Sequence, residues 1–286
     1  MTGRLPVLVR ALRPHHWLKN GFVVAPALFS GNALDPAAMG RVALTVVSFC
    51  LASSAGYLVN DVLDRASDAA DPRRRARPVA SGELGTGPAL ALALALAAVG
   101  AAIAAGVTAN VALTLGGYLA ISVSYSLGLK LVPILEAMLL AAGFVVRVVA
   151  GAEAIPVPSS HWLVVCSFLL ALLLAFGKRL ADSSGPVGRR PSYPAILLGG
   201  TVHGLAAVTV VAYVFYTVAP ETIANVGSRR LLLTAPLVLF GVLRYLLLLH
   251  RDGAHDPTAT LIGDRPLLVA VVAWAVLAAA IVAGHS

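Results

Sequence analysis

The stretch YLVNDVLDRASDAADPRRRARP, residues 57–78, interrupts a chain that is otherwise strongly apolar. Its acidic residues are Asp61, Asp64, Asp68 and Asp71, and its basic residues are Arg65, Arg73, Arg74, Arg75 and Arg77. On a helix, residues three or four positions apart share one face with Cβ atoms roughly 5 to 6 Å apart, so the first three aspartates would stack. Like charges at that spacing repel each other. The stretch therefore predicts that a cation neutralises this face.

Two kinds of cation fit the acidic face. Hard carboxylate oxygens suit Mg²⁺, which usually keeps several waters and completes its coordination shell with substrate phosphates. The predicted metal ligands are Asp61, Asp64 and Asp68, with Asn60 beside them at the catalytic centre. Alternatively, the arginines at 73–75 and 77 fold back and neutralise the acids in a solvated network of ion pairs. Acids mixed with bidentate guanidinium donors favour a site for a phosphorylated substrate.

The sequence on either side of this stretch is that of a membrane protein. The chain has 286 residues, of which 59% are hydrophobic and only 12% charged. A run of about 20 apolar residues suffices to cross a bilayer, and about nine such runs can be placed. They cover residues 17–34, 41–60, 87–106, 108–127, 133–151, 161–180, 194–219, 230–250 and 264–283. We expect an all-α polytopic fold, because backbone polar groups in lipid must be satisfied within each segment.

The run at 17–34 has a second interpretation. GFVVAPALF (21–29) follows basic residues and resembles the apolar core of a cleaved signal peptide. Trp17, Lys19 and Asn20 favour an interfacial anchor instead. We therefore expect residues 1–16 to form an amphipathic segment and residues 1–286 to form one transmembrane domain.

The net charge of +8 is explained by membrane topology rather than by nucleic-acid binding. With the N-terminus in the cytoplasm, the lysines and arginines gather on the cytoplasmic side, as the positive-inside rule requires. The exceptions are Arg41, Arg229 and Arg230 on the other side and Arg147 within a span. We therefore predict a multi-pass protein of the plasma membrane whose N-terminus and active site face the cytoplasm.

Further polar residues collect at the same predicted ends of the spans. Tyr125 and Lys130 lie at the end of one run, where an interfacial aromatic and a snorkelling lysine are the alternative interpretation. Lys178, Arg179 and Asp182 end another run. One site that faces the cytoplasm is implied. Its predicted substrate-binding residues are Lys19, Arg74, Arg77, Tyr125, Lys130, Lys178, Arg179 and Asp182.

Arg147 lies in AAGFVVRVVAG (141–151), inside a predicted span, where a charge is costly unless it faces a cavity or a partner. One interpretation is a structural pair with a carboxylate on another helix. The other is a phosphate or sugar contact in a central cavity, and on that basis Arg147 joins the predicted substrate-binding residues. Glu136 is on nearly the same face but roughly 16 Å away along the helix axis, too far to pair.

The motifs of this chain resemble those of a known family. NDVLDRASD (60–68) reads as the NDxxDxxxD motif of the UbiA superfamily of intramembrane prenyltransferases. Other stretches resemble its decaprenyl-phosphate phosphoribosyltransferase branch. They are RPHHWLKNGFVVAPALFSG (13–31), NDVLDRASDAADPRRRARPVASG (60–82), YSLGLKLVPILEAMLLAAGFVVRVVAG (125–151), FGKRLAD (176–182) and, more weakly, DPTATLIGDRPL (256–267). The resemblance implies transmembrane helices around a central cavity that faces the cytoplasm and opens to lipid.

This resemblance also implies an activity. It is the transfer of 5-phosphoribosyl from phosphoribosyl pyrophosphate to a polyprenyl phosphate such as decaprenyl phosphate, with Mg²⁺ as cofactor and pyrophosphate as the second product. Such a reaction is an early step toward lipid-linked arabinose donors for the cell wall, and the branch suggests a homotrimer in the lipid bilayer. The branch usually has aspartate where this chain has Glu136 and glutamate where it has Asp182, which leaves acceptor and sugar specificity open.

Two other functions compete with this one. The first is UbiA-type transfer of an isoprenyl group from its pyrophosphate to an aromatic or other acceptor, or a related terpene cyclisation. Ordinary prenyltransferases of the superfamily carry a second aspartate-rich motif after the sixth span, where this chain has GKRLAD (177–182). Lys178 and Arg179 at that place favour a phosphorylated sugar. The second competitor is a carrier of lipid phosphates, which would not need stacked aspartates.

Overall fold

Residues 7–155, 157, 160–182, 193–252 and 256–284 are described by the computed structural model, and they form helices and connecting segments without any strand. The first half of the chain contains α1 (Val7–Leu12), η1 (Pro14–Val24), α2 (Ala25–Phe29), η2 (Asn32–Leu34), α3 (Pro36–Leu63), α4 (Arg65–Ala70), α5 (Thr86–Val107), α6 (Ala109–Leu127) and η3 (Leu129–Leu131). The second half contains α7 (Leu135–Ala154), α8 (His161–Asp182), α9 (Ala195–Val218), α10 (Pro220–Val226), η4 (Arg229–Thr234), α11 (Ala235–Asp252), α12 (Pro257–Gly263) and α13 (Arg265–Ala283). The predicted all-α class is confirmed.

Eight helical segments in the described part of the chain are long and apolar enough to cross a membrane. They are α3, α5, α6, α7, α8, α9, η4 joined to α11, and α13, and each coincides with a predicted apolar run to within a few residues. Several begin at side-chain caps. Asp35 accepts a hydrogen bond from the backbone N–H of Ala37 at the start of α3, and Thr108 accepts one from Val111 at the start of α6.

The predicted first span, 17–34, differs from the other eight because it is not one long helix, and the count of about nine transmembrane helices stays a prediction. The 3-10 helix η1 is followed by the short helix α2, and neither is among the long helices. Pro14 begins η1, and Pro26, which has no N–H to donate, lies where η1 gives way to α2. Gly151 also shapes this segment, because a Cβ there would lie 2.0 Å from the carbonyl oxygen of Val23. Only glycine lets η1 pack so closely on α7.

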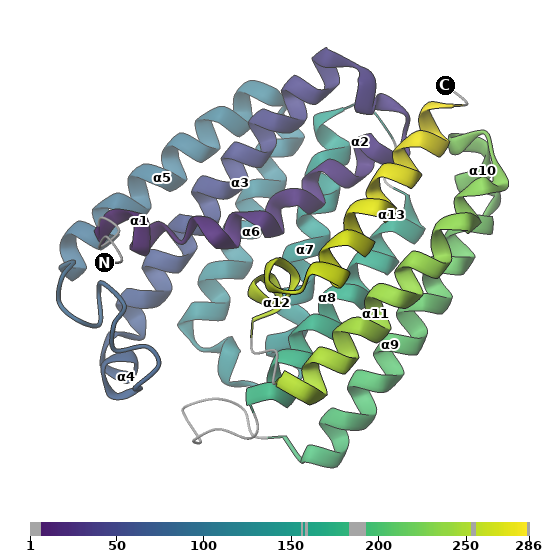
Figure 1. Cartoon of the computed structure of the whole chain (residues 1–286). Helices are drawn as coiled ribbons and strands as arrows, with labels where there is room; N and C mark the ends of the chain where they lie inside the picture. The colour runs from purple at the N-terminus through teal and green to yellow at the C-terminus, as the bar shows by residue number, and fades with distance from the viewer. Residues whose placement is uncertain (1–6, 156, 158–159, 183–192, 253–255, 285–286) are drawn as a thin grey trace.

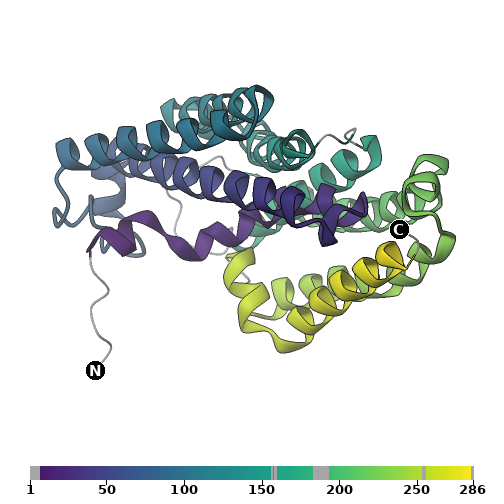
Figure 2. The same ribbon diagram turned by 90° about the horizontal axis from the view of Figure 1, so that it is seen from above.

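The long helices follow one another around the molecule. α3 packs on α5, α6 on α7, α7 on α8, α8 on α9, and α11 on α13, while η1 contacts both α3 and α7. Figure 1 shows η1 and α2 crossing the bundle obliquely, and Figure 2 shows them between the helices of the first half and those of the C-terminal end. The N-terminal segment therefore reaches the centre of the molecule.

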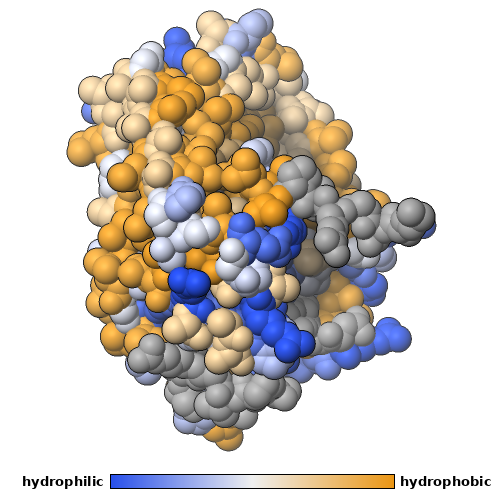
Figure 3. Space-filling model, turned by 90° about the vertical axis from the view of Figure 1, so that its left-hand side faces the viewer, coloured by the Kyte–Doolittle hydropathy of each residue, from blue (hydrophilic) through white to orange (hydrophobic). Residues whose placement is uncertain are grey.

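The outer surface of this bundle is apolar, as expected of a protein surrounded by lipid. Leu94, Leu113 and Val269 are 73%, 76% and 65% exposed. An apolar groove of about 380 Å³ lies between α7 and α8, lined by residues that include Val146 and Phe168. Polar side chains are concentrated in the lower half of the face in Figure 3, whose upper half is mostly hydrophobic. α4 and the C-terminal ends of α8 and α11 lie at that lower end in Figure 1.

Candidate active site

The acidic stretch lies where α3 passes into α4. Asp64 separates the two helices, with φ −91° and ψ 2°. The backbone still follows a nearly helical path, because the N–H of Asp64 donates to the carbonyl of Asn60 at 2.9 Å and the N–H of Asp68 donates to that of Asp64 at 2.8 Å. The interruption at Asp64 lets its side chain leave the face that Asp61 and Asp68 share.

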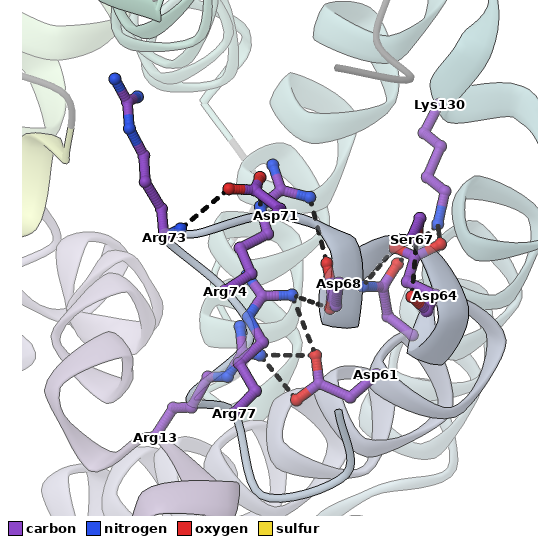
Figure 4. Close-up of polar contacts among 11 residues, drawn as sticks. Arg13, Asp61, Asp64, Ser67, Asp68, Asp71, Arg73, Arg74, Arg77 and Lys130 are labelled. Carbon is purple, nitrogen blue, oxygen red and sulfur yellow. Dashed lines mark hydrogen bonds and ion pairs between the residues drawn. The ribbon is translucent and has the colours of Figure 1, made fainter. Parts of the chain in front are cut away.

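Asp61 and Asp68 are buried, 2% and 1% exposed, and three arginines surround them. Arg13 Nη2 donates to both oxygens of Asp61, at 2.5 and 2.6 Å. Arg77 Nη1 lies between the two acids, 3.2 Å from Asp61 Oδ1 and 2.5 Å from Asp68 Oδ2. Arg74 Nη1 lies 3.3 Å from Asp68 Oδ1. Figure 4 shows these side chains converging from η1, from α3 and α4, and from the loop after α4.

Asp64 belongs to a second set of contacts (Figure 4). Lys130, from η3, places its ammonium 2.6 Å from Asp64 Oδ1 and 3.0 Å from Asn60 Oδ1. Asn60 Nδ2 donates to the other Asp64 oxygen at 3.0 Å. The structure therefore brings Asn60, Asp64 and Lys130 together as predicted. We call the two sets together the acid–arginine network: Asn60, Asp61, Asp64, Asp68, Arg13, Arg74, Arg77 and Lys130.

The acid–arginine network matches the alternative in which arginines fold back and neutralise the acids, with two differences. Arg74 and Arg77 fold back on the acids, whereas Arg73 lies 3.9 Å from Asp182 on α8. Arg13 supplies a contact that the sequence pattern did not identify. Among the described residues, no three His, Cys, Asp or Glu side chains converge as a metal site. Asp61 and Asp68 nevertheless both contact Arg77 Nη1, so the two carboxylates lie close together. Two carboxylates, with substrate phosphates as further ligands, suit Mg²⁺, and the donor set therefore fits this ion.

A second group of cations lies beside the network. Lys19 of η1 and Lys178 of α8, both half-buried, are close enough to interact electrostatically with each other and with Asp256, the N-cap of α12. Burial, together with Lys19 and His15, lowers the pKa of nearby His16 to about 3, so this ring is neutral at physiological pH. Asp182 is a further electrostatic neighbour of Lys178, so the two lysines lie among both acidic and basic side chains. We call Lys19 and Lys178 the lysine pair.

Arg179 is held by a partner that the sequence analysis did not find. Its Nε donates to Glu136 Oε1 at 2.5 Å and its Nη2 contacts Oε2, while the Tyr193 hydroxyl donates to Oε1 at 3.3 Å. Tyr125 is an electrostatic neighbour of both Glu136 and Arg179. Within the described part of the chain, Arg179 Nη1 is buried with no hydrogen-bond partner. A signal was available, because Glu136 begins α7 and Arg179 ends α8, and consecutive antiparallel helices bring such ends together.

Arg147, 5% exposed, is surrounded by neutral partners instead. Nε donates to Asn20 Oδ1 at 2.7 Å, Nη1 to the Gly143 carbonyl at 2.7 Å, and Nη2 to the Tyr118 hydroxyl at 3.1 Å. The guanidinium also lies 4.5 Å from the centre of the Tyr118 ring. We call these four residues the Arg147 cluster. Each guanidinium nitrogen has a protein partner, and none of these partners is a carboxylate. The substrate contact of Arg147 stays a prediction.

Fold and site together define a polytopic α-helical membrane protein with a compact charged site at one end of its bundle. The chain belongs to the UbiA prenyltransferase family, which matches residues 21–265. Membership of this family makes it an enzyme, a transferase, rather than the lipid-phosphate carrier considered above.

Known relatives agree with this assignment. The decaprenyl-phosphate phosphoribosyltransferase of Mycolicibacterium smegmatis is 31% identical over 93% of this chain and 89% of its own length. The protein of that name from Mycobacterium tuberculosis is 31% identical over 96% of this chain and 94% of its own length. A UbiA homologue from Archaeoglobus fulgidus, solved bound to GPP and Mg²⁺, has the same fold. It matches with a TM-score of 0.74 at 20% identity and covers 97% of this chain and 99% of the solved one.

Proposed function

We propose that this enzyme transfers a 5-phosphoribosyl group from phosphoribosyl pyrophosphate to a polyprenyl phosphate and releases pyrophosphate. The observation that carries the proposal is the pair of charged regions at one end of the bundle. The acid–arginine network offers carboxylates and guanidinium donors, and the lysine pair adds two further cations beside it. This reaction brings together three phosphate groups: the donor's 5-phosphate, its pyrophosphate and the acceptor phosphate. The names of the two mycobacterial relatives support the same substrates.

Mg²⁺ would be held by Asp61 and Asp68, with Asp64 beside them. When bound, it would neutralise charge on the pyrophosphate and make it a better leaving group. Arg74 and Arg77 would donate hydrogen bonds to phosphate oxygens, since a guanidinium matches phosphate geometry bidentately. Both guanidiniums contact Asp68, one of the acids proposed to hold the metal, which supports a role for them in binding the pyrophosphate.

The acceptor would attack the sugar from the side opposite to the pyrophosphate. The bond from the anomeric carbon to the pyrophosphate oxygen breaks, a bond to the acceptor phosphate oxygen forms, and the configuration at that carbon inverts. No general base is required, because the acceptor phosphate is ionised at neutral pH. Lys19, Lys130, Lys178 and Arg179 would hold the remaining phosphates, with Tyr125 and Asp182 contributing polar contacts.

The place and assembly of the enzyme are also proposals. The polyprenyl tail would extend sideways from the site into the lipid. The protein would be a homotrimer in the plasma membrane, with its site and its N-terminus facing the cytoplasm. The product would then serve as a precursor of lipid-linked arabinose donors for the cell wall. Reporter fusions to Ser286 and to the N-terminus test the orientation, and light scattering in detergent tests the trimer.

The activity is tested with purified full-length protein, Mg²⁺, labelled phosphoribosyl pyrophosphate and polyprenyl phosphates of several chain lengths. We expect a labelled lipid that is absent when the divalent cation is chelated. Geranyl pyrophosphate with an aromatic acceptor is the matched alternative assay. Prenylation of that acceptor without any labelled phosphoribosyl lipid would replace the proposal by ordinary prenyl transfer.

A further inference from the structure

Arg13 is a prominent cation of the site that the sequence motifs leave unassigned. Its Nη2 contacts both carboxylate oxygens of Asp61 (Figure 4). Its guanidinium also lies 5.2 Å from the centre of the Tyr57 ring. It comes from the junction between α1 and η1, whereas Arg74 and Arg77 come from the loop after α4. Arg13 is therefore carried by a different segment from the other arginines of the network.

The backbone of Arg13 supports a specific placement of its side chain. With φ 54° and ψ 58°, it adopts the left-handed conformation that residues other than glycine rarely populate. Such a conformation persists where the surroundings fix it, and such residues concentrate at functional sites. The ion pair with Asp61, the Tyr57 ring and the hydrogen bond from His16 N–H to the Arg13 carbonyl, at 2.9 Å, hold it here.

Arg13 is also the arginine of the network with the fewest carboxylate partners. Arg77 contacts two carboxylates, Asp61 and Asp68, and Arg74 contacts Asp68 and Asp71. Arg13 has a single carboxylate partner among the described residues, so its release breaks one ion pair. Both oxygens of Asp61 face Arg13, and a divalent cation that uses them must displace this guanidinium.

We propose that Arg13 is a further donor-binding residue, which neutralises Asp61 in the free enzyme and contacts the donor's pyrophosphate oxygens once a divalent cation has replaced it there. The inference rests on the proposed function, in which Asp61 holds the metal. A guanidinium released beside a pyrophosphate finds paired oxygen acceptors that suit its planar donors. The Tyr57 ring keeps Arg13 close to the site during the exchange.

The first test measures Mn²⁺ binding to the full-length protein in detergent, without donor, from the electron paramagnetic resonance signal of free Mn²⁺. Arg13→Met removes the competing charge, and we expect the Kd for Mn²⁺ to fall about tenfold. The matched control is Arg10→Met, because Arg10 lies three residues before Arg13, in α1, but pairs with Glu83, which is outside the network. The control should leave the Kd unchanged. An unchanged or higher Kd in Arg13→Met overturns the exchange.

The second test measures binding of inorganic pyrophosphate at saturating Mn²⁺. We expect Arg13→Met to raise the Kd for pyrophosphate about tenfold, because a charge-assisted contact is lost. An unchanged value overturns the contact. If Arg13→Met does not fold, Arg13→Gly is judged by the same two measurements, since glycine accepts φ 54° without strain. Wild-type protein that passes both tests but transfers no phosphoribosyl group would refute the proposed reaction while leaving the role of Arg13 intact.

Discussion

Arginine has opposite roles in two regions of this molecule. In the acid–arginine network, Arg13, Arg74 and Arg77 face buried carboxylates, and each contact is an ion pair. In the Arg147 cluster, the guanidinium faces an amide, a carbonyl and a hydroxyl, all of them neutral. In an ion pair, a metal cation can take the place of the guanidinium beside the carboxylate, and a phosphate can take the place of the carboxylate beside the guanidinium. A neutral partner that belongs to the packed interior offers no such exchange.

This difference indicates which charges can serve chemistry and which hold the fold. The network holds arginines and carboxylates next to each other. The proposed metal ion would pair with the carboxylates and the proposed pyrophosphate with the arginines, so that no charge would be left without a partner in the membrane. Arg147 instead joins η1, α6 and α7 through Asn20, Tyr118 and Gly143. We infer that it anchors the oblique N-terminal segment, which in turn carries Arg13 and Lys19 to the site.

The largest expected effect comes from breaking the network at an acid. Asp61→Asn should lower kcat at least about 1,000-fold, which corresponds to roughly 4 kcal/mol of transition-state stabilisation. The physical reason is the loss of a carboxylate that the proposed metal needs. The measurement is steady-state turnover of the labelled lipid, with the fraction of folded protein checked by size-exclusion chromatography.

Asp71→Asn is the matched control for this acid. Asp71 lies in the same stretch and contacts Arg74 at 3.4 Å, but it is outside the network. Its substitution should change kcat less than about threefold, as expected of a surface pair. Comparable losses in both variants would mean that the stretch acts through general folding rather than through Asp61.

The next effect is on stability and comes from the Arg147 cluster. Arg147→Met should destabilise the protein by about 2 to 4 kcal/mol, because it leaves the buried Asn20 oxygen and Gly143 carbonyl without their donor. Thermal unfolding in detergent measures this, with Arg230→Met, at an exposed position, as the control. Turnover per folded molecule should fall far less than in Asp61→Asn. A large loss of turnover at unchanged stability would restore Arg147 as a substrate contact.

Much of the fold was predictable because a run of apolar residues is a local signal. The eight long helices follow directly from such runs. The form of η1 was not predictable, since it depends on the approach of Val23 to Gly151, far away in the chain. The apolar pattern of residues 17–34 predicts a membrane span in either case, whether the segment forms one straight helix or a 3-10 helix followed by a short α-helix.

The site was predictable in its composition but only partly in its pairing. The spacing of Asp61 and Asp68 placed both on one face, and the nearby arginines did fold back on them. Arg13 was interpreted as a topology signal, because a basic residue before an apolar run carries that meaning on its own. The partners of Arg147 lie on η1 and α6, and nothing in the local pattern distinguishes Asn20 or Tyr118 from other polar residues in a span.

A smaller effect is expected at the lysine pair. Lys178→Ala should raise the KM for phosphoribosyl pyrophosphate about tenfold with little change in kcat, because one charge-assisted contact to a phosphate is lost from binding. Initial rates at varied donor concentration measure this. Arg251→Ala, an exposed cation near the end of α11, is the control and should leave the KM unchanged. A rise in the KM for polyprenyl phosphate alone would assign Lys178 to the acceptor instead.

The smallest effect is expected at a partly exposed ion pair outside both regions, Arg244 with Asp264. Arg244 donates to both oxygens of Asp264, at 3.1 and 2.8 Å, and these bonds hold the pKa of Asp264 below its usual 3.8. A depressed carboxyl pKa contributes stability that is present above the unfolded value and lost as the pH falls through the folded one. In the Asp264→Asn variant, the asparagine side chain can still cap α13. The melting temperature of this variant at neutral pH should therefore lie only slightly below that of the wild-type protein.

That gap should close as the pH falls below about 4 and passes through the depressed pKa of Asp264, where the wild-type carboxyl becomes protonated. Melting temperatures of both proteins across this range measure the effect, and Arg244→Met should show the same convergence. A gap that stays constant down to the acid end would mean that the carboxylate contributes through its cap alone. Because this pair is partly exposed and lies outside both the acid–arginine network and the Arg147 cluster, its loss should be tolerated.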